Sequence, residues 1–344
     1  MFWVNRTRFV LPTVGAAEAA PVRAAGYELS VVEAREDAFT ELVVSWNADA
    51  PPGASIHVEA RVRYAREDDQ PEAAAWSGWR TLGRWGGAPD AEPPPLADAP
   101  GADEPAVRVD VDTLRLSDGY EATAFQLRLT LHGGPATPVV RQLAASTVHR
   151  GRPPVDAAAD APLGRPVRLE APARSQMVER PEIAGEICSP TSVAMVLSYY
   201  GVEQPTEQVA AGVFDHGARI YGNWPFNVAY AAQHGMRGVV RHFTSMQDLE
   251  RELQAGRPVI ISVAYAAGEL PESPLRQTNG HLIVIKGVNE AGDFIVNDPA
   301  ADPRAGQSVE QVYTRANLRR VFLSRGGVGY VIEPEAADAA GDAR

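Results

Sequence analysis

Cys188 is the only cysteine among the 344 residues of the chain, and it stands where a helix is expected to begin. Pro190 is favoured in the first turn of a helix, apolar residues recur at helical spacing after it, and Gly201 can end the helix. A thiol at a helix start lies beside unpaired backbone N–H groups and the positive end of the helix dipole, which favour the nucleophilic thiolate. The same N–H groups would stabilise an oxyanion. The alternative is that Cys188 is a small buried hydrophobic residue.

A cysteine nucleophile needs a base that accepts its proton and a group that orients the base. His281 begins one predicted strand and Asp298 follows the next, across a turn that starts at Asn289. A turn of two residues places the two side chains directly opposite each other, and a turn of four places them diagonally; both put them on one face of the sheet. A three-residue turn without a bulge would separate them. Singly, His281 could be a strand-end histidine on the surface and Asp298 a turn aspartate before proline, but together with Cys188 they favour a triad.

The elements around these residues differ between the two halves of the chain. Between residues 27 and 147, short runs of alternating apolar and polar residues, with no convincing helix, predict a β-sandwich. After a linker-like stretch, helices are expected to precede an antiparallel sheet, which is an α+β pattern. The helices are expected at 189–200, from 205, at 225–233 and at 245–254; the strands at 167–170, 258–263, 281–288, 293–297 and 328–332. The predicted fold is therefore a β-sandwich domain at 1–149, a linker at 150–165, an α+β domain at 166–334 and a disordered tail at 335–344.

Two groups of residues in the first half offer binding chemistry. Trp76, Trp79 and Trp85 would stack on sugar rings if exposed, which makes a cell-envelope polymer a candidate partner of this domain. The favoured interpretation is core packing, or a ladder with Arg80 and Arg84, because tryptophan is usually mostly buried. His57 and His132 lack companions for a metal site and are expected at the surface. The stretch 88–105, rich in proline and alanine, is expected to be an exposed loop.

Three sequence blocks resemble the C39-like family of papain-fold cysteine peptidases: CSPTS at 188–192, GHLIVI at 280–285 and VNDP at 296–299. The resemblance covers roughly residues 167–334. It implies a papain-like α+β fold with Cys188 as nucleophile, His281 as general base and then acid, and Asp298 as the orienting carboxylate. The family's oxyanion-hole glutamine is matched by Gln176, farther upstream of the cysteine than in bacteriocin-leader proteases. Ser189 replaces the glycine of many relatives and is expected to narrow the approach to the thiol.

Composition limits the remaining choices. The chain is 45% hydrophobic and 22% charged, as soluble globular proteins are, and its net charge of −12 argues against a nucleic-acid partner. No apolar run is long enough for a transmembrane segment. No signal peptide is visible, which favours the cytoplasm, while the domain pairing would also suit an exported protein. No cofactor or metal site is predicted.

The sequence therefore predicts a cysteine peptidase or amidase that cleaves a peptide or protein substrate through a thioacyl-enzyme intermediate. One alternative is an acyltransferase that uses the same triad to pass the acyl group to an amine. The other is a catalytically silent protein that binds a cell-envelope polymer through its first domain.

Overall fold

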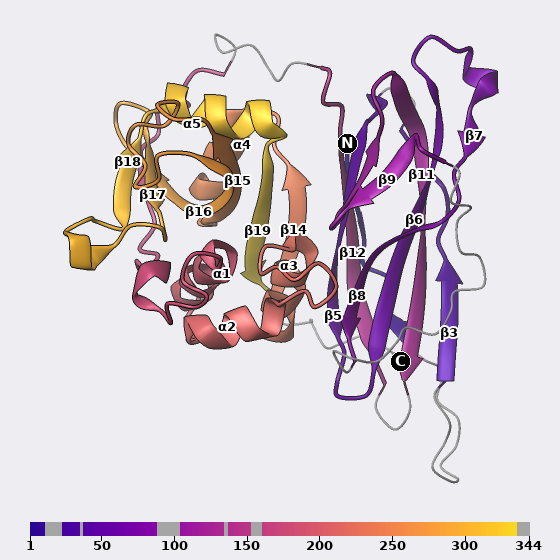
Figure 1. Cartoon of the computed structure of the whole chain (residues 1–344), viewed down its shortest axis with the longest axis horizontal. Helices are drawn as coiled ribbons and strands as arrows, with labels where there is room; N and C mark the ends of the chain where they lie inside the picture. Colours follow the sequence, from indigo (N-terminus) through magenta and orange to yellow (C-terminus); the bar gives the residue numbers. More distant parts are fainter. Residues whose placement is uncertain (11–22, 35–36, 88–103, 134–136, 153–159, 336–344) are drawn as a thin grey trace, which may run out of the picture.

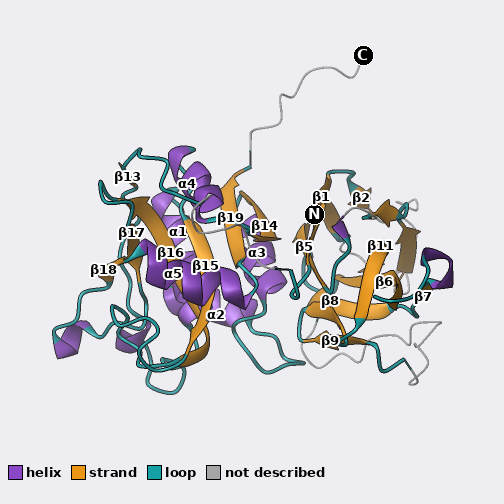
Figure 2. Ribbon diagram, turned by 90° about the horizontal axis from the view of Figure 1, so that it is seen from above, coloured by secondary structure: helices purple, strands orange, loops and turns teal. Residues whose placement is uncertain are grey.

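The computed structural model describes residues 1–10, 23–34, 37–87, 104–133, 137–152 and 160–335. The chain forms two domains that lie side by side (Figure 1). The first consists almost entirely of strands, and the α-helices gather around the sheet of the second (Figure 2). The expected loop at 88–105 and tail at 335–344 fall mostly outside the described residues, and so do residues 153–159 of the expected linker at 150–165. No helix of the described part is long and apolar enough to span a membrane.

The N-terminal domain contains two antiparallel sheets of six strands each. Their inward side chains share one buried apolar cluster, as alternating sequences require. The first sheet has the order β1-β12-β5-β10-β9, with β2 beside β12; its strands are β1 (Phe2–Asn5), β2 (Phe9–Val10), β5 (Glu41–Asp49), β9 (Val107–Asp110), β10 (Thr113–Leu116) and β12 (Val139–Val148). The second has the order β3-β11-β6-β7, with β4 beside β11 and β8 beside β6; its strands are β3 (Arg23–Glu28), β4 (Val32–Glu33), β6 (Ser55–Arg66), β7 (Ala75–Trp76), β8 (Arg80–Gly86) and β11 (Tyr120–Gly133).

The expectation that His57 and His132 are surface residues is wrong. They are 3% and 9% exposed, and their rings meet edge to face with centroids 5.6 Å apart. Both lie on the central strands β6 and β11, where neighbouring side chains cover the polar face as well as the apolar one. Burial, with the nearby His132 and Arg84, lowers the pKa of His57 to about 4, so the ring is neutral at pH 7.

The tryptophans are packed rather than presented to solvent. Trp79 and Trp85 are 7% and 5% exposed, and Trp76 is half-buried. A cation–π ladder does form, but the guanidinium of Arg61 lies over both Trp76 and Trp79, at 5.0 and 4.7 Å from the ring centroids, and that of Arg128 lies 4.6 Å from the centroid of Trp79. The predicted ladder partners, Arg80 and Arg84, were therefore wrong. Because the tryptophan rings are packed against other side chains, their stacking on sugar rings is no longer supported.

The C-terminal domain has one antiparallel sheet of seven strands between two groups of helices. Leu282 and Val284 of β16 pack with α1 to α3, whereas Ile283 and Ile285 pack with α4 and α5. The sheet order is β14-β19-β15-β16-β17-β18, with β13 beside β16; the strands are β13 (Val167–Arg168), β14 (Met236–His242), β15 (Val259–Tyr265), β16 (Thr278–Val288), β17 (Phe294–Asn297), β18 (Glu310–Tyr313) and β19 (Val328–Pro334). The helices are α1 (Cys188–Tyr199), α2 (Thr206–Val213), α3 (Trp224–Gln233), α4 (Met246–Gln254) and α5 (Arg315–Phe322).

Side chains of the first domain complete the edge of the second domain's sheet. Strand β14 pairs with β19 on one side only, and its other edge faces β5 and β12. The side-chain amide of Asn47 donates to the carbonyl of Gly238 at 2.7 Å and accepts from its N–H at 2.9 Å. The N–H of Val240 donates to Ser45 Oγ at 3.0 Å, and the N–H of His242 donates to Ser146 Oγ at 2.8 Å.

An apolar contact continues the core from one domain into the other. The ring of Phe226, on α3, lies edge to face against Trp46 at 6.0 Å and Trp85 at 5.3 Å, measured between ring centroids. Gly83 makes room for this contact, because a Cβ there would lie 2.7 Å from Trp46. Buried side chains of both domains consequently form one cluster.

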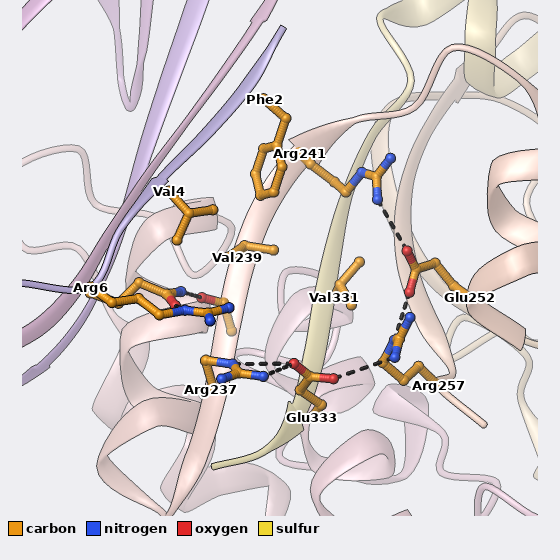
Figure 3. A pocket seen from close by; sticks show the side chains of 12 residues that line it. Phe2, Val4, Arg6, Arg237, Val239, Arg241, Glu252, Arg257, Val331 and Glu333 are labelled. Atoms are coloured by element: carbon orange, nitrogen blue, oxygen red, sulfur yellow. Dashed lines mark hydrogen bonds and ion pairs between the residues drawn. The ribbon is translucent and has the colours of Figure 1, made fainter. Parts of the chain in front are cut away.

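A charged groove of about 200 Å³ also lies at this junction (Figure 3). Glu333 bridges Arg237 and Arg257, and Glu252 bridges Arg257 and Arg241, around the apolar side chain of Val331. These four ion pairs lie within the second domain. Across the junction, Arg141 of β12 pairs with Glu335 at 3.2 Å and donates to the carbonyl of Ala232 at 2.8 Å, in addition to the hydrogen bonds to β14 and the Phe226 contact.

Candidate active site

Cys188 lies at the first residue of α1, as the sequence predicted. The cap position is occupied by Ile187, which makes no side-chain hydrogen bond to the helix start. The helix is tied to the sheet behind it, because Ser192 Oγ donates to the carbonyl of Leu282 on β16 at 3.2 Å. Helix α1, which begins with Cys188, and the strand that carries His281 are therefore fixed against each other.

The hairpin of β16 and β17 has a different turn from either predicted one, yet it reaches one of the predicted registers. Val288 pairs with Phe294 across a five-residue turn, and a bulge between Ile285 and Gly287 then shifts the pairing by one residue. Beyond the bulge, Val284 pairs with Asn297, which is the register of the four-residue turn. His281 and Asp298 consequently lie diagonally on one face, within reach of each other.

The two side chains form a buried ion pair. His281 Nε2 lies 2.7 Å from Asp298 Oδ1, and the residues are 3% and 0% exposed. The other carboxylate oxygen accepts a hydrogen bond from Tyr313 at 2.5 Å and a longer one from Ser273 at 3.4 Å, while the N–H of Ala300 donates to Oδ1 at 2.9 Å. The carboxylate is therefore held in one orientation by donors on β18 and on two loops.

The charges of the site favour a thiolate next to an imidazolium. Burial works against both ions, but the hydrogen bond and positive charge of His281, with the N–H of Leu282, hold the pKa of the Cys188 thiol below its ordinary value. The charge and hydrogen bond of Asp298 outweigh burial and raise the pKa of His281 well above the usual range. Since Nε2 faces Asp298, Nδ1 is the ring nitrogen left for the sulfur.

Gln176 lies close to the chain segments that carry two of these residues. Its N–H donates to the carbonyl of Pro299, next to Asp298, at 2.9 Å. Its side chain is 4% exposed, with Nε2 donating to the carbonyl of Ala184 at 2.7 Å and Oε1 buried without a partner. Ala184 belongs to the loop that leads to Cys188, so Gln176 links this loop to the loop of Asp298.

The half-buried Cys188 opens into a cleft of about 880 Å³. Gly222 and Trp224 line the cleft, so the chain contributes to the cleft where it enters α3, with Asn223 as the helix cap. The expectation that Ser189 narrows the approach to the thiol is not met, because its side chain is fully buried and lies 3.1 Å from the hydroxyl of Tyr330.

Tyr313, Ser273 and the cleft residues Arg115 and Arg150 were not predicted from the sequence. Tyr313 ends β18, a short strand without a clear alternating pattern. Arg115 lies on β10 of the N-terminal domain, and only the arrangement of the two domains brings it to the cleft.

Comparisons with known proteins agree with the division into two parts. Residues 168–330 match the model of the Peptidase C39 like family, and residues 18–148 match the model of the Peptidase C39 N-terminal domain. None of the curated proteins compared with the chain matches it.

Two solved structures are similar to half of the chain. One is a protein from Bacillus anthracis assigned as a C39-like peptidase (18% identity, TM-score 0.38, covering 50% of this chain and 100% of that one). The other is a double glycine motif protease from an AMS/PCAT transporter in complex with the leader peptide (21% identity, TM-score 0.32, covering 49% of this chain and 98% of that one). Because both TM-scores are low, the assignment rests on the family models, and the C-terminal part of this chain belongs to the peptidase C39-like family.

Proposed function

We propose that the chain is a cysteine peptidase or amidase that uses Cys188, His281 and Asp298 as a catalytic triad. The observation that carries this proposal is the buried 2.7 Å pair of His281 and Asp298 next to a cysteine whose thiol pKa is lowered and which opens into a cleft. An ion pair with a purely structural role can also shift the pKa of its members. Such a role would not explain why a cysteine with a lowered pKa lies beside the pair and opens into the same cleft. We also propose that the C-terminal domain has a papain-like fold and that the N-terminal domain is a β-sandwich.

In the proposed reaction, the Cys188 thiolate attacks the carbonyl carbon of a peptide or amide bond. The tetrahedral oxyanion collapses as His281 gives its proton to the leaving amine, which leaves a thioacyl-enzyme. His281 then takes a proton from water, whose oxygen attacks the thioester. The second tetrahedral intermediate collapses, the acid product departs, and the Cys188 thiolate is expelled beside the protonated His281, which restores the starting ion pair. Asp298 keeps Nδ1 of His281 aimed at the sulfur throughout. An amine in place of this water would give acyl transfer, so identifying the product as an acid or a new amide separates the two reactions.

A peptide fits the cleft because one strand edge is left without a strand partner there. Strand β15 pairs with β19 only up to Ile261, while Ser262 to Ala266 line the cleft. Among the described strands, none pairs with this side of Val263. An extended peptide can form backbone hydrogen bonds to such an edge.

The first test is the pH dependence of iodoacetamide alkylation of Cys188. Because His281 lowers the thiol pKa, rapid alkylation is expected at pH values well below the free-thiol pKa of about 8.5. In His281→Ala, burial and the charge of Asp298 raise the thiol pKa and only the N–H of Leu282 opposes them, so the rate should rise only near or above that pH. His234→Ala is the matched control, since this histidine caps the C-terminus of α3, its ring bonds to the carbonyl of Tyr230, and it does not line the cleft. Identical profiles for the native protein and His281→Ala would refute the triad.

Gln176 is proposed to donate to the oxyanion through the N–H of its side chain that does not bond to Ala184. Gln176→Ala is then expected to lower kcat by about 10²- to 10³-fold, with KM and the alkylation rate of Cys188 little changed. If Gln176 only links the two loops, the variant should instead lower the melting temperature and slow alkylation, because Cys188 and His281 lose their alignment. Measuring kcat, KM and the alkylation rate on one preparation distinguishes the two roles.

A further inference from the structure

We propose that Arg115, Arg150 and Arg325 make this cleft selective for substrates that carry a carboxylate beside the scissile bond. The inference rests on the proposed function, because it concerns the cleft into which Cys188 opens. It assigns to the N-terminal domain a direct part in substrate choice, since Arg115 lies on β10 and Arg150 follows β12.

The side chains that line the cleft carry more positive than negative charge. Its lining includes three arginines and a single acidic residue, Glu186. The chain as a whole has a net charge of −12, so a positively charged cleft is a local exception to the overall balance. A cleft lined by one sign of charge concentrates ligands of the opposite sign.

The carboxylates that accompany the arginines do not occupy the cleft wall. Glu41, which is 4% exposed, pairs with both Arg115 and Arg150 from behind. Asp110 pairs with Arg115 and also with Arg108. Arg325, the third arginine of the cleft, pairs with Glu269. None of these three carboxylates lines the cleft, so on the cleft wall the arginines are accompanied by Glu186 as the acidic residue.

The guanidinium groups of Arg150 and Arg325 keep hydrogen-bond donors for a ligand. Arg150 uses Nε on Glu41 at 2.9 Å, and Arg325 uses Nη2 on Glu269 at 3.4 Å. A guanidinium has five N–H donors in a planar fork that suits a carboxylate. The side chains of Arg150 and Arg325 are 38% and 47% exposed, so a ligand in the cleft can reach them.

Arg150 is held where the two domains meet at the cleft. The backbone N–H of Arg150 donates to Thr40 Oγ1 at 3.0 Å, and its guanidinium rests against Gly326. A Cβ at Gly326 would lie 3.0 Å from Arg150 Nη2, so glycine permits this approach. The contact places Arg150 next to Arg325, and the two domains build one cationic end of the cleft.

The test compares the alkylation of Cys188 by iodoacetate with that by iodoacetamide, two reagents that differ by one carboxylate. His281 itself attracts the anionic reagent, so the ratio of the two rates is compared between variants rather than with a free thiol. We expect Arg150→Gln and Arg325→Gln to lower the ratio by about two- to fivefold each. Arg152→Gln is the control, because Arg152 pairs with Glu121 and does not line the cleft. An unchanged ratio in Arg150→Gln and Arg325→Gln would overturn the inference.

Peptide libraries then identify the source of the carboxylate. One library carries Asp or Glu side chains and an amidated C-terminus; the other is neutral in its side chains and has a free C-terminus. A third library, neutral in its side chains and amidated at its C-terminus, is the reference. The source of the carboxylate is identified by the library that is cleaved faster than this reference and whose advantage is smaller in Arg325→Gln. Equal cleavage of all three libraries would overturn the inference while leaving the proposed function in place, whereas slow iodoacetamide alkylation at neutral pH would refute the proposed function. Arg325 is the safer position, because Glu269, its carboxylate partner among the described residues, is one-third exposed to solvent.

Discussion

Cys188→Ala is expected to abolish hydrolysis, with kcat lowered by about 10⁵-fold or more. Without the sulfur no thioacyl-enzyme can form, and His281 and Asp298 have no nucleophile to activate; removal of a nucleophile from such a triad costs nearly as much as removal of the whole triad. The fold should persist, because Cys188 is half-buried and alanine is a good helix former. The measurement is the rate of peptide cleavage, followed by mass spectrometry, together with the melting temperature.

Ser189→Ala is the matched control for this variant. Its hydroxyl is buried against Tyr330 and points away from the cleft, so the substitution should lower stability while leaving the alkylation of Cys188 fast. Cleavage that survives Cys188→Ala would show that the activity has another source. A binding protein without activity would show no cleavage in either the native protein or Ser189→Ala.

The largest effect on stability is expected from Trp46→Ala. Trp46 is fully buried between the two sheets and contacts Phe226 of the other domain, so alanine would leave a cavity and lower the free energy of unfolding by about 3–5 kcal/mol. Because the buried cluster runs through both domains, they should unfold in one transition, and the variant should shift that whole transition. Urea denaturation followed by tryptophan fluorescence and by circular dichroism measures both effects.

Trp76→Ala provides the comparison, since it removes the same type of side chain from a half-buried place under Arg61 and Arg63. A smaller loss of stability is expected there. Two separate transitions, of which Trp46→Ala moves only the one belonging to the N-terminal domain, would contradict the idea of a shared core.

The sequence was most informative where chemistry and local pattern coincide. The segment after Cys188 has helical spacing, and α1 begins within one residue of the prediction. The face of the hairpin that carries His281 and Asp298 was predicted from the alternation of strand side chains, although the actual turn is longer. A bulge at Lys286 compensates for the extra residue, and no local pattern signals a bulge. Whether these three residues act together in catalysis stays a prediction until the variants are measured.

Other features depend on contacts that a single segment does not contain. His57 was placed at the surface because it falls on the polar face of an alternating strand, but in a central strand that face is covered too. Strand β14 was missed because its partners on one edge are side chains of the other domain. The cationic end of the cleft, where Arg150 lies next to Arg325, was likewise not predicted, because it forms only when the two domains are in contact.

The way the N-terminal domain covers β14 bears on what would happen if the two parts were cut apart. Removing Asn47, Ser45 and Ser146 would leave the N–H groups of Gly238, Val240 and His242 on a bare sheet edge. Such an edge is a template for pairing with another chain, so the C-terminal domain expressed alone would tend to aggregate or to associate edge to edge. The first domain thus also protects the second against misassembly. This protection would favour keeping the two domains on one polypeptide.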